Sequence, residues 1–112
     1  KMAYVPTRFA GPVAMTTVPM LLTTFTASGI VKEFILTNTS NGVLYFSLAV
    51  VPNGTEYGLD SQKIYNIVPI EGNETITLSH SLVVNSGDKI YGFGSIPRLV
   101  NATISGVSIT AN

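Results

Sequence analysis

The chain contains no cysteine and no tryptophan, and His80 is its single histidine. Without cysteine there is no disulfide framework and no thiolate metal site, so stability must come from packing. One histidine and scattered carboxylates cannot supply the three or four ligands of a usual zinc site. The acidic spacing of an EF-hand calcium loop is absent too. The sequence therefore predicts neither a bound metal nor a cofactor.

Charged residues are also scarce. Asp, Glu, Lys and Arg make up 11% of the chain, against about 25% in an ordinary soluble domain. The formal net charge is zero, and the basic residues are isolated from one another, which argues against nucleic-acid binding. A small protein with so little surface charge is poorly protected against association. We therefore expect it to form a homo-oligomer or to bind a partner protein.

Long apolar runs are missing as well, and none approaches the ~20 residues that a membrane-spanning helix needs. We therefore expect no membrane insertion. No basic segment leads into an apolar stretch, so we expect no signal peptide, with Met2 as the natural start and Lys1 as an addition left from cloning. The length of 112 residues predicts one domain over residues 1–112.

Apolar and polar residues alternate along most of the chain, and threonine, valine and isoleucine are abundant, which indicates β-strands. Turn signals rich in glycine and asparagine separate these segments. Short strands with regular turns favour an all-β fold, a single antiparallel β-sandwich of jelly-roll type. There are seven such segments, or eight strands if the long 74–84 segment bends midway: 20–26, 30–38, 43–51, 63–68, 74–84, 88–94 and 99–110.

Two strands have a clear face pattern. In segment 43–51, alternation predicts an inward apolar row of Leu44, Phe46, Leu48 and Val50. In segment 99–110, Ile104 is out of phase with the later apolar residues, and one additional residue would restore the phase. We therefore predict a β-bulge near Gly106.

The stretch "DKIYGFG" permits two arrangements. If Ile90 points inward, Tyr91 and Phe93 form an exposed aromatic pair. Alternatively the two aromatic rings lie in the core, and Gly92 and Gly94 allow a neighbouring backbone to approach closely. The sequence does not decide between these arrangements.

His80 lies on the apolar side of segment 74–84, while Ser79 and Ser81 face the other side and cannot pair with it. We expect a structural histidine, a neutral ring with one bonded nitrogen. A weaker alternative is a histidine at a subunit interface that confers acid sensitivity. No catalytic residue is predicted, and we do not expect an enzyme. A less favoured alternative is a small cell-wall-acting enzyme that uses paired carboxylates, either Glu71 with Glu74 or Glu56 with Asp60.

Four stretches together resemble a known family. They are "MAYVPTRFAGPV", "IVKEFILTNTS", "VVNSGDKI" and "NATISGVSIT", and they occur in this order over nearly the whole chain. The chain resembles small virion-associated proteins of tailed phages that infect Gram-positive bacteria, most closely the short siphophage proteins encoded just after the tail-tip and tail-lysin genes. The resemblance implies a β-sandwich related to domains of phage receptor-binding proteins, made in the host cytoplasm and located at the tail tip of the virion. It carries over no catalytic or binding residue.

The leading hypothesis is a non-enzymatic structural or accessory protein of the tail tip or baseplate. It would act by self-association and by contacts with other phage tail proteins. Tyr45, Tyr91 and Phe93 are the candidate interface residues, because aromatic side chains are preferred anchors in such contacts.

The alternative is an adhesin module that binds a saccharide or receptor of the host cell surface. Such sites combine an aromatic platform with polar neighbours on a loop. The stretch "GTEYGLDSQKIYN" offers this combination in its candidate ligand residues, Tyr57, Asp60, Gln62 and Tyr65.

Overall fold

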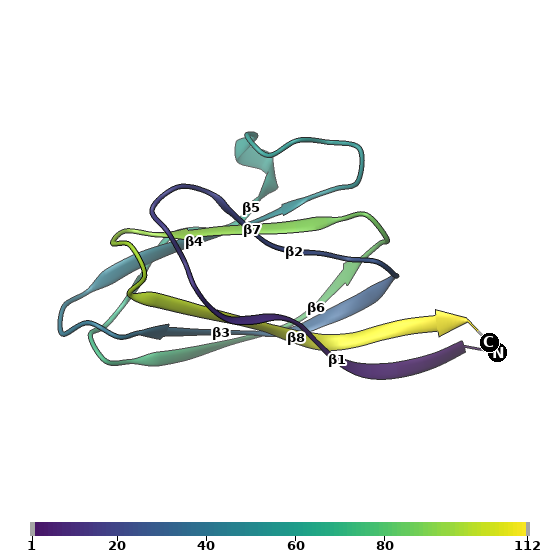
Figure 1. Cartoon of the computed structure of the whole chain (residues 1–112), viewed down its shortest axis with the longest axis horizontal. Coiled ribbons are helices and arrows are strands. Elements are labelled where there is room, and N and C mark those ends of the chain that lie inside the picture. Colours follow the sequence, from purple (N-terminus) through teal and green to yellow (C-terminus); the bar gives the residue numbers. More distant parts are fainter. Residues whose placement is uncertain (1, 112) are drawn as a thin grey trace.

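A computed structural model describes residues 2–111, and this part of the chain is all-β (Figure 1). None of its helices is long and apolar enough to cross a membrane. Residues 2–111 form eight strands and one short 3-10 helix: β1 (Met2–Ala14), β2 (Met20–Thr24), β3 (Gly29–Asn38), β4 (Leu44–Val51), η1 (Asp60–Gln62), β5 (Lys63–Ile70), β6 (Thr75–Val84), β7 (Lys89–Gly94) and β8 (Val100–Ala111).

The strands form two four-stranded antiparallel sheets that face each other. The first sheet has the order β1-β8-β3-β6 and the second has the order β2-β7-β4-β5. This order is that of a jelly roll, so the predicted fold class is confirmed. The eighth strand does not come from a division of segment 74–84, because β6 is one strand over Thr75–Val84. The additional strand is β1.

Strand β1 was not predicted because its sequence contains strand breakers. Pro6, Gly11 and Pro12 all lie within it, and proline within a run argues against a central strand. β1 is an edge strand of the first sheet, where a missing N–H is tolerated, and it pairs with β8 from Met2↔Ala111 to Ala14↔Asn101. The first and last strands of the chain, β1 and β8, therefore lie side by side (Figure 1).

The core lies between the two sheets. Phe34 from β3 and Phe46 and Leu48 from β4 are at most 1% exposed, and burying each such side chain contributes roughly 1.5–3 kcal/mol. In the predicted row on β4, Leu44 is buried with them, and the half-buried Val50 packs against the same cluster. The predicted inward face of β4 is confirmed.

The predicted irregularity near Gly106 is present, but the additional residue belongs to a neighbouring strand. Between β3 and β8 the register passes from Val31↔Gly106 to Glu33↔Ser105, so Lys32 is the extra residue. A Cβ on Gly106 would lie 2.0 Å from the carbonyl oxygen of Ile30. Glycine is needed here because the bulged backbone of β3 lies so close.

Strand β7 adopts the first of its two possible arrangements. Ile90 is fully buried, whereas Tyr91 and Phe93 are half-buried on the outer face of the second sheet. Gly92 faces the core, where a Cβ would lie 2.8 Å from the Met15 sulfur and 2.9 Å from a Leu48 methyl group. Its missing side chain therefore leaves room for core side chains.

Candidate interaction face of the second sheet

The outer face of the second sheet collects the three predicted interface residues. Phe93 lies opposite Ser47 across the β4–β7 ladder, and Tyr91 lies opposite Ala49. Residues opposite each other in a ladder share a face. Tyr45 precedes Ser47 by two residues on β4, so it belongs to the same face, and it is 42% exposed. The structure therefore places Tyr45, Tyr91 and Phe93 on one face, with Tyr45 and Phe93 at the same end of it.

One end of this face is hollowed. The hollow has a volume of about 220 Å³, and its walls are almost wholly apolar. An apolar side chain of a partner could pack into this hollow without meeting a charged group. The lining residues are Tyr45, Phe46, Ser47, Ile67, Phe93, Gly94 and Ser95.

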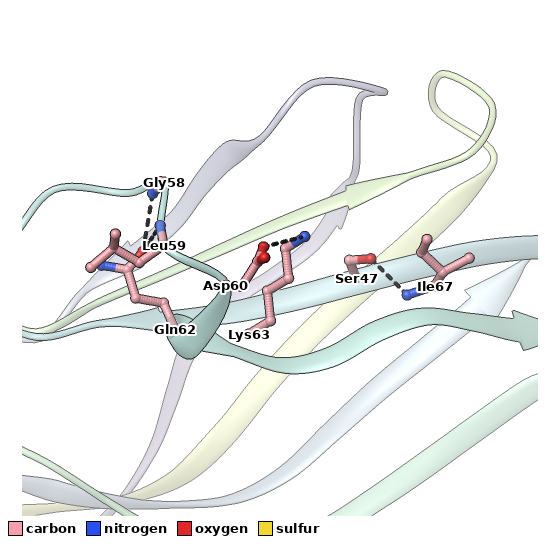
Figure 2. Close-up of polar contacts among 7 residues, drawn as sticks. All are labelled: Ser47, Gly58, Leu59, Asp60, Gln62, Lys63 and Ile67. Atoms are coloured by element: carbon pink, nitrogen blue, oxygen red, sulfur yellow. Dashed lines mark hydrogen bonds and ion pairs between the residues drawn. The ribbon is translucent and has the colours of Figure 1, made fainter.

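Ile67 stands at this hollow with 62% of its surface exposed. Its φ is +52°, a left-handed conformation that is rare for a β-branched residue. Its backbone N–H donates a 2.9 Å hydrogen bond to the Ser47 hydroxyl oxygen (Figure 2). Such a conformation costs on the order of 1–3 kcal/mol and persists only where the surroundings hold it. The strand thus presents a large apolar side chain to solvent at an energetic cost.

The conformation of Ile67 follows from the β4–β5 ladder. Phe46 pairs with Val68, but Leu48 pairs with Tyr65, so β5 carries one additional residue in this interval. An unpaired residue at a bulge bends the strand and re-aims its side chain. Ile67 was not predicted as a site residue, because nothing local to "YNIVP" signals a positive φ.

The loop after β4 contacts the other end of this face. The Tyr57 ring packs against the Tyr91 ring, with 5.0 Å between their centroids. Gln62 is 6% exposed, and its side-chain oxygen accepts hydrogen bonds from the N–H groups of Gly58 and Leu59 (Figure 2). The Gln62 side chain thus stabilises the conformation of the loop and is not exposed for contacts with a ligand. The Asp60 side chain is fully exposed and lies 3.6 Å from the Lys63 ammonium.

Tyr65 points away from this loop into the space between the sheets. Its hydroxyl is 2.5 Å from Nε2 of His80, and both rings pack edge-on against Phe34. Burial raises the pKa of Tyr65 above its ordinary value of 10.0. The four predicted ligand residues therefore do not converge. His80 lies in the setting predicted for a structural histidine, with one ring nitrogen bonded.

The acidic residues do not gather. Within residues 2–111, no group of three histidine, aspartate or glutamate side chains is close enough to hold a metal ion. Glu71 and Glu74 are exposed at the turn between β5 and β6, where the Glu74 N–H donates to the Glu71 carbonyl oxygen. Neither they nor Glu56 and Asp60 line the apolar hollow.

The sequence and the fold were compared with known proteins. No protein-family model matches the chain, and no curated protein or solved structure matches it.

Proposed function

We propose that this protein is a non-enzymatic assembly component of a phage tail tip or baseplate. It joins copies of itself or other tail proteins through the outer face of the second sheet. The single observation that carries the proposal is the apolar hollow beside the exposed, strained Ile67. The resemblance described from the sequence supplies the tail-tip setting.

The chemistry of the face supports protein contacts. Fully desolvated aromatic side chains are the usual anchors of protein interfaces, and Tyr45 and Phe93 flank a hollow that an apolar group can fill. No Asp, Glu, Lys or Arg lines this hollow, so a partner meets no buried charge there. Contacts of this kind would also cover apolar surface on a chain whose 11% of charged residues gives little protection from nonspecific association.

The adhesin alternative receives no support from the loop chosen for it. Gln62 is engaged within the loop, and Tyr65 is engaged with His80. Tyr57 remains half-buried against Tyr91. A saccharide platform with polar neighbours is not assembled there.

The first experiment is quantitative mass spectrometry of purified virions. We expect this chain at a small symmetric copy number, stoichiometric with tail-tip proteins. Its absence from the particle would overturn the tail-tip proposal.

A variant pair tests the face itself. In Tyr45→Ser with Phe93→Ser, we expect incorporation into particles to fall about tenfold or more, since anchor truncations cost on the order of 1–2 kcal/mol each or more. Tyr4→Ser is the matched control, because Tyr4 is 66% exposed and lies on the first sheet. Urea unfolding of all variants checks that they fold. Unchanged incorporation of the folded double variant would show that this face is not the contact.

A further inference from the structure

The outer face of the first sheet carries a second, polar hollow. It is a shallow hollow, largely open to solvent, with a volume of about 470 Å³. Its lining combines two cations, a carboxylate and two hydroxyls with one proline ring: Pro6, Thr7, Arg8, Lys32, Glu33, Ser105 and Gly106.

The hollow lies where three β-ladders slip together. β1 has an additional residue against β8 next to Arg8, and β3 has Lys32 additional against β8. β6 has one additional residue against β3 at the same level, between Ser79 and Leu82. Bulges bend a strand and re-aim its side chains, and they are common next to binding sites. Three bulges at the same level therefore distort the sheet at this hollow.

At the level of these bulges, one row of paired residues across the sheet carries a charge at each end. Arg8 pairs with Ser105, and Ser105 pairs on its other side with Glu33. Arg8 and Glu33 are therefore two strands apart, at about 10 Å between backbones. Among residues 2–111, neither side chain makes a hydrogen bond or ion pair, whereas Lys32 donates to the Ser81 hydroxyl at 3.3 Å.

We propose that this hollow binds an anionic sugar, a hydroxylated ring that carries one carboxylate or phosphate. The Arg8 guanidinium takes the anionic group, for which its planar set of donors is suited. The Glu33 carboxylate accepts hydrogen bonds from ring hydroxyls on the other side, and the Ser105 hydroxyl lies between them. Pro6 offers an apolar wall, and Lys32 adds a second positive charge. Glu33 disfavours a small bare anion, because its own charge repels one.

This site is independent of the proposed assembly contact. The two hollows share no residue, and they lie on different sheets of the sandwich. A chain packed through its second sheet keeps this face open.

The test is an NMR titration of the ¹⁵N-labelled protein with glucuronate, glucose 6-phosphate and glucose, which share one ring. We expect saturable amide shifts at residues 7–8, 32–33 and 105–106 with at least one charged sugar. Binding of glucose should be about tenfold weaker, as expected for the loss of one charge-assisted hydrogen bond. The first two sugars distinguish a carboxylate from a phosphate preference.

Single substitutions test the roles proposed for Arg8 and Glu33. Arg8→Gln should remove the preference for the charged sugars, and Glu33→Gln should weaken all three. Arg98→Gln is the matched control, an exposed arginine that does not line the hollow. The proposal is overturned if no saturable shift occurs, if Arg8→Gln behaves as the control does, or if inorganic phosphate binds as tightly as glucose 6-phosphate.

Discussion

Tyr65 of the second sheet and His80 of the first are joined by a hydrogen bond of 2.5 Å between the phenol oxygen and Nε2. β5 and β6 are edge strands of their sheets. The bond therefore links the sheets at a side where no other strand covers the core, and the two rings with Phe34 fill the space behind it.

Tyr65→Phe keeps the ring and removes this bond. We expect the free energy of unfolding to fall by about 1 kcal/mol, the usual net contribution of one such bond. Urea unfolding measures it, with Tyr4→Phe as a control at an exposed tyrosine. A double-mutant cycle with His80→Leu should give a coupling energy of similar size. Additive effects would show that the two groups do not interact in solution.

The raised pKa of Tyr65 predicts a loss of stability in alkali. Above pH 10.0 the unfolded chain ionises this phenol while the folded chain still holds its proton. The folded state then binds more protons than the unfolded state, so stability is full below pH 10.0 and falls as the pH rises through the higher folded pKa. The free energy of unfolding of Tyr65→Phe should decline less between neutral pH and this range. Parallel pH profiles of both proteins would contradict the assignment.

Ile67→Gly separates stability from assembly. Glycine adopts a positive φ without strain, which offsets its entropic cost of about 0.5–1 kcal/mol. We expect the free energy of unfolding to stay level or to rise by about 1 kcal/mol. Association through the second sheet should weaken, because the exposed side chain is gone. Ile67→Val, which keeps the strain and most of the apolar surface, is the control. Sedimentation and particle incorporation measure association, and full association of the glycine variant would count against Ile67 as an anchor.

Gly106→Ala should be strongly destabilising. The new methyl group would lie 2.0 Å from the Ile30 carbonyl oxygen and 2.9 Å from the Lys32 nitrogen, and both are backbone atoms of the bulge. A loss of about 2–3 kcal/mol is expected, at the upper end for overpacking. At Gly42 an added Cβ meets nothing within 4 Å, so Gly42→Ala should unfold at nearly the same denaturant concentration as the unaltered chain. Equal midpoints for the two variants would rule out this close approach.

Asn38→Ala should also cost about 2–4 kcal/mol, because it leaves buried groups without partners. Asn38 is fully buried, and its amide donates to the carbonyl oxygens of Gly42 and Ile70. Its own oxygen accepts from the Ser40 N–H. The exposed Asn41 on the same turn is the comparison, and its alanine variant should lose about 0.5 kcal/mol or less. Thermal or urea unfolding measures the loss of stability in both variants. Equal losses would contradict the role given to Asn38.

Sequence patterns predicted the strands whose two faces differ in polarity. β6 was recognisable because Ile76, Leu78 and Leu82 alternate with hydroxyl residues, and burial follows this alternation in the fold. β1 was not predicted, because its prolines argue against a strand. Its partner β8 also lies about a hundred residues away along the chain. Pairing between distant segments leaves no local signal.

The candidate sites were predictable only in part. Alternation along segment 43–51 predicts an outward Tyr45, whereas the pattern of "DKIYGFG" permits both an outward and an inward placement of Tyr91 and Phe93. The exposure of Ile67 depends on an additional residue in β5 relative to β4, and the polar hollow depends on the joint slip of three ladders. Both are properties of register, which one strand's composition does not specify.

β8, the strand that comes last along this sequence, lies inside the first sheet between β1 and β3. Synthesis order and spatial order therefore disagree, and the sheet cannot grow by adding each new strand at its edge. During translation β1 and β3 are synthesised before β8, the strand that lies between them. Until β8 is made, the backbone N–H and C=O groups that will pair with it stay exposed. Folds dominated by such distant pairings form slowly, in roughly milliseconds to seconds. A nascent chain with few charges is most open to aggregation in this interval.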